Sequence, residues 1–206
     1  DYGPDNYAGV TWANLPSTQN RTLFIGWMSN WLYAQVVPTP TWRSALTLPR
    51  ELLLFDVDGT LLLKSAPAKE LEKLRVKSYD LSGKESLLPS TAVEILAEVT
   101  RDDNFSMMLS NELGEEVIIS KEMGLVTVDR RKAGKASFHP DFAAAHAAPM
   151  SWEAKTLRIF LDGSSLELFV NEGELVITSL LFPSSPWKKL TVQQGLGGIE
   201  IFDLTK

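Results

Sequence analysis

The chain has 206 residues, of which 44% are hydrophobic, and carries a formal net charge of −6 with a mean hydropathy of −0.04. This length allows one or two domains with a real hydrophobic core, and the composition is typical of soluble proteins. The acidic balance argues against nucleic acid or an anionic membrane as a partner, and no apolar run reaches the ~18 residues of a membrane span. Because cysteine is absent, disulfides, thiolate metal sites and cysteine nucleophiles are excluded.

The first fifty-five residues read as short strands separated by loops rich in Pro, Ser and Asn. The strands are predicted over 7–12, 22–27, 42–48 and 52–55. Three or four strands in about fifty residues match one antiparallel blade of a β-propeller, or a small sheet. No second copy of this unit occurs in the sequence. If the unit is a blade, the other blades are not in this chain.

Tryptophan is concentrated within this first region. Trp27, Trp31 and Trp42 are interleaved with Asn30 and Arg43. An aromatic ring can cover the apolar C–H face of a sugar, while amide and guanidinium groups bind its hydroxyls. Tryptophans also cluster when they simply pack together, and the residues alone favour that simpler interpretation.

A hairpin is predicted over 52–63, with Asp58-Gly59 as its turn, followed by a polar connector over 64–90 that could contain a short helix at 68–77. The segment from Asp56 to Thr60 also matches the Asp-x-Asp-Gly-Thr signature of haloacid-dehalogenase-type phosphatases. In that family the first Asp, here Asp56, is the nucleophile, the second, here Asp58, is the acid/base, and Mg²⁺ holds the phosphate. That fold needs alternating strands and helices after the motif, so the phosphatase is kept only as a remote alternative.

From residue 92 onward the sequence alternates between apolar and polar residues with a period of two, which predicts many short strands and hence a β-sandwich. The Ala-rich stretch from Ala143 to Met150 is expected to be a loop that crosses the sandwich. The strands are predicted at 93–99, 105–109, 116–120, 125–129, 156–161, 166–170, 175–181, 190–193 and 198–204.

Isolated acidic and histidine residues give no catalytic centre on their own. A glycosidase needs two carboxyl groups on either side of the bond that it cleaves, and near the aromatic cluster the carboxylates are Asp1, Asp5, Glu51 and Asp56. Carboxylates are common on the surface of an acidic protein, so none of them is singled out. The two histidines lack a cluster of further ligands, so no metal site and no cofactor are predicted. Asn20 and Asn104 lie in sequons that could carry glycans.

Several motifs in a fixed order carry a resemblance to a known family. They are Asp1-Tyr2-Gly3-Pro4-Asp5-Asn6-Tyr7-Ala8, Ile25-Gly26-Trp27-Met28-Ser29-Asn30-Trp31, the run from Trp42 to Leu52, the run from Glu70 to Arg75, the run from Leu157 to Asn171, and Thr178-Ser179-Leu180-Leu181-Phe182-Pro183. Together they strongly resemble glycoside hydrolase family 32, which contains the invertases, levanases and exo-inulinases. The resemblance covers nearly the whole chain.

The resemblance implies an all-β chain, with the last blade of a five-bladed β-propeller followed by a C-terminal β-sandwich. It places the final blade at 1–55, the hairpin and connector at 56–90, and the sandwich at 91–206, so that the Asp56 motif falls at the passage between the two domains. It also implies a retaining glycoside hydrolase that releases fructose from sucrose or fructans such as levan and inulin. In that mechanism one carboxylate attacks the anomeric carbon while a glutamic acid protonates the leaving oxygen.

The catalytic motifs of the family are missing from this sequence. Asn-Asp-Pro does not occur, Arg101-Asp102 is followed by Asp103 instead of Pro, and Glu-Cys is impossible without cysteine. We therefore expect no catalytic residue in this chain, which alone would be inactive and would begin inside a larger protein. The resemblance implies that this chain still contains part of the substrate-binding surface, formed by Trp27 with Asn30 and Trp31.

The resemblance also predicts partners and a location. The expected partner is the N-terminal propeller part of the same protein, with sucrose or a fructan as substrate, no nucleic acid, no membrane, and a possible homo-oligomer through the sandwich. The location would be secreted, extracellular or periplasmic. The alternative from a different class is a non-catalytic carbohydrate-binding or structural module that acts alone.

Overall fold

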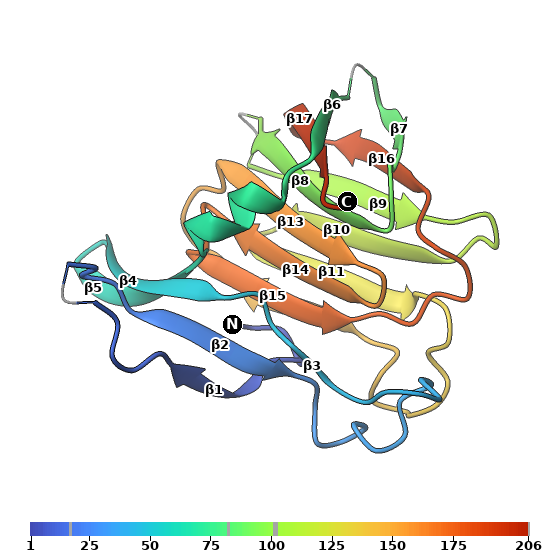
Figure 1. Ribbon diagram of the computed structural model, residues 1–206. Helices are drawn as coiled ribbons and strands as arrows, with labels where there is room; N and C mark the ends of the chain where they lie inside the picture. Colours follow the sequence, from blue (N-terminus) through green and yellow to red (C-terminus); the bar gives the residue numbers. More distant parts are fainter. Residues whose placement is uncertain (17, 82, 101–102, 206) are drawn as a thin grey trace.

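The computed structural model describes residues 1–16, 18–81, 83–100 and 103–205. Its strands form three antiparallel sheets, of which two are six-stranded and stack into a sandwich, while the first strands form a five-stranded sheet beside it (Figure 1). No helix among the described residues is long and apolar enough to cross a membrane.

The first sheet has the strand order β1-β2-β4-β5, and β3 pairs with β2 as well. Its strands are β1 (Tyr7–Thr11), β2 (Leu23–Met28), β3 (Ala45–Leu46), β4 (Arg50–Val57) and β5 (Thr60–Pro67). The predicted hairpin is confirmed, because β4 and β5 pair from Arg50↔Pro67 to Val57↔Thr60 around the two-residue turn Asp58-Gly59. Both turn residues have positive φ, 50° and 82°, as a type I′ turn requires.

The segment expected as hairpin and connector, 56–90, contributes to all three sheets. The short helix predicted at 68–77 is a 3₁₀ helix, η1 (Lys69–Leu74). It is followed by β6 (Lys77–Asp80) and β7 (Glu85–Leu87), which are edge strands of the two sandwich sheets. By strand pairing, therefore, the β4–β5 hairpin belongs to the first sheet and the rest of this segment leads directly into the sandwich.

The sandwich consists of the sheets β12-β11-β10-β9-β16-β7 and β15-β14-β13-β8-β17-β6. Every strand predicted there from the period-2 pattern is present. The bounds are β8 (Ala92–Val99), β9 (Phe105–Ser110), β10 (Glu116–Glu122), β11 (Leu125–Lys132), β12 (Ala145–Pro149), β13 (Thr156–Asp162), β14 (Ser165–Val170), β15 (Leu175–Leu180), β16 (Lys189–Gln194) and β17 (Leu196–Asp203).

The prediction of a loop from Ala143 to Met150 is wrong, because this stretch contains the strand β12. Residues 145–149 pair in register with β11, at the edge of their sheet. Alanine has a low β-propensity, so backbone pairing with β11 decides the conformation here against the local preference. Only Ala148 of this strand is fully buried, which is why the pattern of apolar residues is weak.

Three strands of the second sandwich sheet are buried on both faces. The inner face contributes to the main core, whereas the outer face of β13–β15 packs on the first sheet and on η1 through a smaller cluster that includes Leu71, Phe160, Phe169 and Val176. All six residues of β15 are buried. Double-sided burial explains why apolar residues such as Phe160, Phe169 and Val176 also occupy the outer face of these strands.

Buried ion pairs join the first sheet to this outer face. Arg50, with a fully buried side chain, donates to Asp1 Oδ2 at 2.7 Å, to Glu167 Oε2 at 2.6 Å and to Thr178 Oγ1 at 2.7 Å. The backbone of Gly3 lies so close to β15 that a Cβ there would come within 2.1 Å of the Thr178 carbonyl oxygen. The buried charge of Arg50 at this junction is therefore paired with two carboxylates, although its Nε has no hydrogen-bond partner.

Candidate functional site

An exposed row of aromatic side chains crosses the first sheet at Trp27. In β2, Trp27 is opposite Tyr7 of β1 on one side and Leu46 of β3 on the other. The ring of Tyr7 meets the ring of Trp27 edge-on, with centroids 6.4 Å apart, and Trp31 lies tilted against Trp27 at 5.0 Å. Since Trp31 is 66% exposed and Tyr7 56%, the row presents flat ring surface to the outside.

Tyr7 is not among the site residues expected from the sequence. It belongs to the Asp1–Ala8 motif, but only the strand register brings it beside Trp27. The register shifts at a bulge between Tyr7 and Val10, so a regular pairing of the first two predicted strands would have placed Ala8 opposite Trp27 and missed Tyr7.

Asn30 holds the turn that carries Trp31. Its Nδ2 donates to the Pro4 carbonyl oxygen at 2.9 Å, and its Oδ1 accepts from the Leu32 amide at 2.9 Å. Its own carbonyl oxygen accepts from the amides of Tyr33 and Ala34. The structure thus brings Trp27, Asn30 and Trp31 together, with the Trp31 ring exposed, the Trp27 ring half-buried and the Asn30 amide bonded to the backbone.

The same turn is anchored to the sandwich by a fully buried ion pair. Arg130 Nη1 donates to Asp5 Oδ2 at 2.5 Å, while the Tyr33 hydroxyl donates to Asp5 Oδ1 at 2.5 Å and accepts from Arg130 Nη2 at 3.0 Å. The guanidinium of Arg130 stacks over the Phe142 ring at 3.9 Å. Burial, together with the adjacent Asp5 carboxylate, raises the pKa of Tyr33, so its hydroxyl stays protonated and keeps donating.

Trp42 and Arg43 do not join the aromatic row. Trp42 lines a separate pocket at the junction of the first sheet with the sandwich, and its carbonyl oxygen accepts from the Thr39 hydroxyl at 2.5 Å. Arg43 donates through Nη1 to the Gln35 carbonyl oxygen. The tryptophan cluster seen in the sequence is therefore divided between two places.

The carboxylates near the aromatic cluster are occupied within the chain. Asp1 and Asp5 are in the buried ion pairs with Arg50 and Arg130. Glu51 accepts from Arg21 Nε at 2.8 Å, and Asp56 Oδ1 accepts from the Gly59 amide at 2.9 Å. None of these four residues is a free carboxylate beside the aromatic row.

The histidines do not form a metal site. Over the described ranges, no group of three or more His, Cys, Asp or Glu side chains is placed to hold a metal ion. His146 lies on β12, and its Nε2 is buried without a hydrogen-bond partner. Burial, aided by the positive charge of Arg130, lowers the pKa of His146.

Comparison with known sequences decides the family. The sequence model described as glycosyl hydrolases family 32 N-terminal domain matches residues 1–65, and the model described as glycosyl hydrolases family 32 C terminal matches residues 62–205. The chain belongs to glycoside hydrolase family 32. It is 34% identical to a levanase of Bacillus subtilis and 29% identical to an extracellular exo-inulinase of Aspergillus niger.

This family 32 chain is shorter than its curated relatives. The alignment with the Bacillus levanase covers 100% of this chain but 33% of the levanase, and that with the Aspergillus exo-inulinase covers 90% of this chain but 38% of the relative. The chain therefore spans about a third of the length of the relatives that it matches.

Solved structures of family 32 proteins confirm the fold. An exo-inulinase from Aspergillus awamori superimposes with a TM-score of 0.81 at 25% identity, over 98% of this chain and 43% of that one. A beta-fructofuranosidase from Bombyx mori gives 0.76 at 25% identity, over 100% of this chain and 42% of that one. The expected all-β fold, a last propeller blade followed by a β-sandwich, is confirmed.

Family membership excludes the phosphatase alternative. Asp56 and Asp58 lie at the turn of an antiparallel hairpin, whereas the phosphatase signature needs an α/β sheet behind it. The match is thus a coincidence of hairpin residues. Arg101-Asp102, the pair that departs from the Arg-Asp-Pro motif of the family, falls outside the described residues.

Proposed function

We propose that this chain is the C-terminal part of a retaining glycoside hydrolase that releases fructose from sucrose or from fructans such as levan and inulin. In this proposal the two catalytic carboxylates lie in earlier blades of the propeller, which this chain does not contain. The chain alone would then be inactive.

The observation that carries the proposal is the aromatic row. Trp27 and Trp31 lie side by side, largely outside the core, on a turn that Asn30, Tyr33 and Arg130 hold in place. A sugar ring stacks its C–H face on such a surface, and a rigid surface loses little entropy on binding. Within the whole enzyme these residues would orient the fructose unit and exclude water from one side of it.

The exposure of the first sheet also supports the proposal that propeller blades outside this chain pack against it. Its edge strand β1 is exposed at all five residues, a state that natural proteins avoid because open edges aggregate. We propose that the preceding propeller blades of the same protein cover this edge. The exposed large apolar side chains of this sheet are Tyr7, Val10, Trp12, Leu46, Leu53, Leu54, Leu61 and Leu63.

The domain division is part of the same proposal. It places the final blade at 1–55, a hairpin and connector at 56–90 and the sandwich at 91–206, and strand pairing supports moving the first boundary to the end of β5, at Pro67. A secreted location is proposed because the Aspergillus niger relative is an extracellular exo-inulinase. Association of two copies through the sandwich stays a prediction.

The proposal can be tested in a chimera. This chain would replace the matching third of the Bacillus levanase, to which it is 34% identical over 100% of its length. We expect the chimera to release fructose from levan. Trp27→Ala should lower kcat/KM roughly 10–100-fold, since a stacked ring contributes about 1.5–3 kcal/mol.

Leu113→Ala is the control, because Leu113 is an exposed apolar side chain of the sandwich, outside the sheet that the preceding blades are proposed to cover. It should leave kcat/KM within about twofold. If the chain alone releases fructose, the claim that its catalytic carboxylates lie elsewhere is wrong. If a folded chimera binds levan but never cleaves it, the chain is a carbohydrate-binding module instead.

A further inference from the structure

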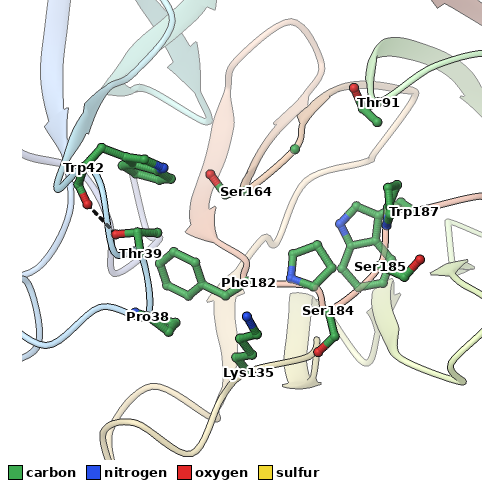
Figure 2. A pocket seen from close by; sticks show the side chains of 13 residues that line it. Pro38, Thr39, Trp42, Thr91, Lys135, Ser164, Phe182, Ser184, Ser185 and Trp187 are labelled. Carbon is green, nitrogen blue, oxygen red and sulfur yellow. Dashed lines mark hydrogen bonds between the residues drawn. The ribbon is translucent and has the colours of Figure 1, made fainter.

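A pocket of about 390 Å³ lies at the junction of the first sheet and the sandwich, away from the aromatic row. The loop after β2 forms one side of it with Pro38, Thr39 and Trp42. The β13–β14 turn and the segment between β15 and β16 form the other side (Figure 2). None of Trp27, Asn30 and Trp31 lines this pocket.

The sandwich side of the pocket is rigid, because backbone hydrogen bonds tie its segments together. The Lys135 amide donates to the Phe182 carbonyl oxygen at 2.8 Å, and the Leu181 amide donates to the Ser164 carbonyl oxygen at 2.7 Å. Gly134, with φ of +92°, lets the chain approach so closely that a Cβ would lie 2.4 Å from the Phe182 oxygen. The pocket is thus formed before any ligand arrives.

Aromatic and proline rings supply most of its surface. Trp42, which is 43% exposed, stands on the opposite side from Trp187, with Phe182 between the loop and the sandwich (Figure 2). An exposed indole face over an apolar floor is the surface that stacks on the C–H face of a sugar.

Six lining residues carry a hydroxyl or ammonium group, and two of these hydroxyls already have partners, since Thr39 donates to the Trp42 carbonyl oxygen and Ser185 donates to Glu112. Trp187 is 4% exposed, and its Nε1 is buried with no hydrogen-bond partner, on the ring edge that faces the pocket (Figure 2). A buried N–H without an acceptor costs about 1–3 kcal/mol, so an acceptor oxygen supplied from the pocket would be favoured. The hydroxyls of Ser164 and Thr39 lie on either side of the pocket.

The charge of the lining favours a neutral ligand. Lys135 is the one cation among the lining residues, it makes no ion pair with any described residue, and no described carboxylate lines the pocket. A single exposed ammonium is weak support for an anion, which proteins bind with several donors or paired charges. Hydroxyl oxygens satisfy both the indole N–H and the ammonium.

We propose that this pocket is a second carbohydrate site, which binds a fructose unit of a fructan chain at a distance from the aromatic row. The Trp42 ring stacks on the sugar, and a hydroxyl oxygen accepts from Trp187 Nε1. This inference rests on the proposed function for the identity of the sugar. A polymeric substrate held at two places is retained between cleavage events, because the second contact is made at high effective concentration.

The experiment uses the whole chain labelled with ¹⁵N. Each of its six tryptophans gives one indole N–H signal, and Trp→Phe variants assign them. Inulotriose, a trimer of fructose, is titrated in, with maltotriose, a trimer of glucose, as the comparison. We expect saturable shifts of the Trp42 and Trp187 signals with inulotriose only.

The variants are made at exposed positions, so that a loss of binding does not result from misfolding of the chain. Trp42→Ala should weaken inulotriose binding at the Trp187 signal roughly tenfold, because it removes the stacking surface. Trp12→Ala, at an almost equal exposure of 44%, should leave that binding within about twofold. Lys135→Met should weaken it less than Trp42→Ala does.

The two proposals fail in different ways. If the Trp27 and Trp31 signals shift but those of Trp42 and Trp187 do not, the second site is wrong and the proposed function stands. If maltotriose shifts Trp42 and Trp187 as strongly as inulotriose, the assignment to fructose units is wrong. If only the Trp42 and Trp187 signals shift, the pocket is supported as a sugar-binding site, and the aromatic row is not one.

Discussion

Arg130 shows how one side chain of the sandwich determines the shape of the candidate site. It is fully buried, and it donates to Asp5, to the Tyr33 hydroxyl, and to the carbonyl oxygens of Phe142 and Leu180. Tyr33 in turn belongs to the turn that carries Trp31. The orientation of the exposed rings therefore depends on a charge in another sheet.

Removal of this charge should destabilise the protein strongly. Arg130→Ala leaves the Asp5 carboxylate buried and unpaired, so we expect the free energy of unfolding to fall by about 3–5 kcal/mol. Urea unfolding monitored by tryptophan fluorescence measures it. Arg131→Ala is the control in the same strand, because Arg131 is 64% exposed in its pair with Asp129 and its removal should leave the free energy of unfolding nearly unchanged. Equal losses in the two variants would contradict the importance of the buried pair.

His146 makes stability depend on pH. Burial and the nearby Arg130 lower its pKa in the folded state below the ordinary value of about 6.5, although Asp5 and Asp129 act in the opposite direction. The unfolded chain then binds more protons than the folded chain as the pH falls below about 6.5. Stability is therefore complete above that pH and is lost as the pH falls toward the lowered pKa.

The measurement is the urea midpoint between pH 7.5 and pH 5. His146→Gln should flatten the decrease, whereas His139→Gln, at the only other histidine, should keep it. A decrease that is unchanged in His146→Gln would assign the pH dependence to other groups.

At the scale of elements, two glycine turns differ in what surrounds them. Gly173, in the β14–β15 turn, has a φ of +96°, and its carbonyl oxygen accepts from the Ser65 amide of β5 at 2.9 Å. A Cβ at this position would lie 2.1 Å from the Ser65 carbonyl oxygen. Gly59, at the tip of the β4–β5 hairpin, has a φ of +82° but nothing within 4 Å of a Cβ.

This contrast predicts that replacing glycine by alanine lowers the free energy of unfolding by different amounts at the two positions. Gly59→Ala should lower the free energy of unfolding by only about 1–2 kcal/mol, which is the strain of a left-handed alanine. Gly173→Ala adds a backbone clash and should cost at least about 2 kcal/mol more, because β5 has to move away from the sandwich. Thermal unfolding of both variants measures the difference, and equal shifts in Tm would show that the junction adapts freely.

At the scale of the whole molecule, much of the fold could be predicted because its signals are local. In β9, Phe105, Met107 and Leu109 are buried and alternate with half-buried residues, as the period-2 pattern indicated. The Asp58-Gly59 turn depends on the conformational preference of two residues. By contrast, β12 forms through pairing with β11, which leaves little trace in an alanine-rich sequence.

The site was predicted only in part, because its determinants are distant in sequence. Trp27 and Trp31 are together as expected, but Trp42 is in another pocket and Tyr7 joins the row only through strand register. Arg50 and Arg130 gave no sign of burial, since a lone charged residue in a sequence is normally at the surface. Their partners lie in segments that no local pattern connects.

The long-range ion pairs also determine the order in which the protein can form during synthesis. The bonds that fix the first sheet join Asp5 to a residue 125 positions later, Arg50 to one 117 positions later and Asp1 to one 177 positions later. A ribosome releases the first strands well before these partners exist. The contacts that join these strands to the sandwich can therefore form only after nearly all of the sandwich has emerged from the ribosome.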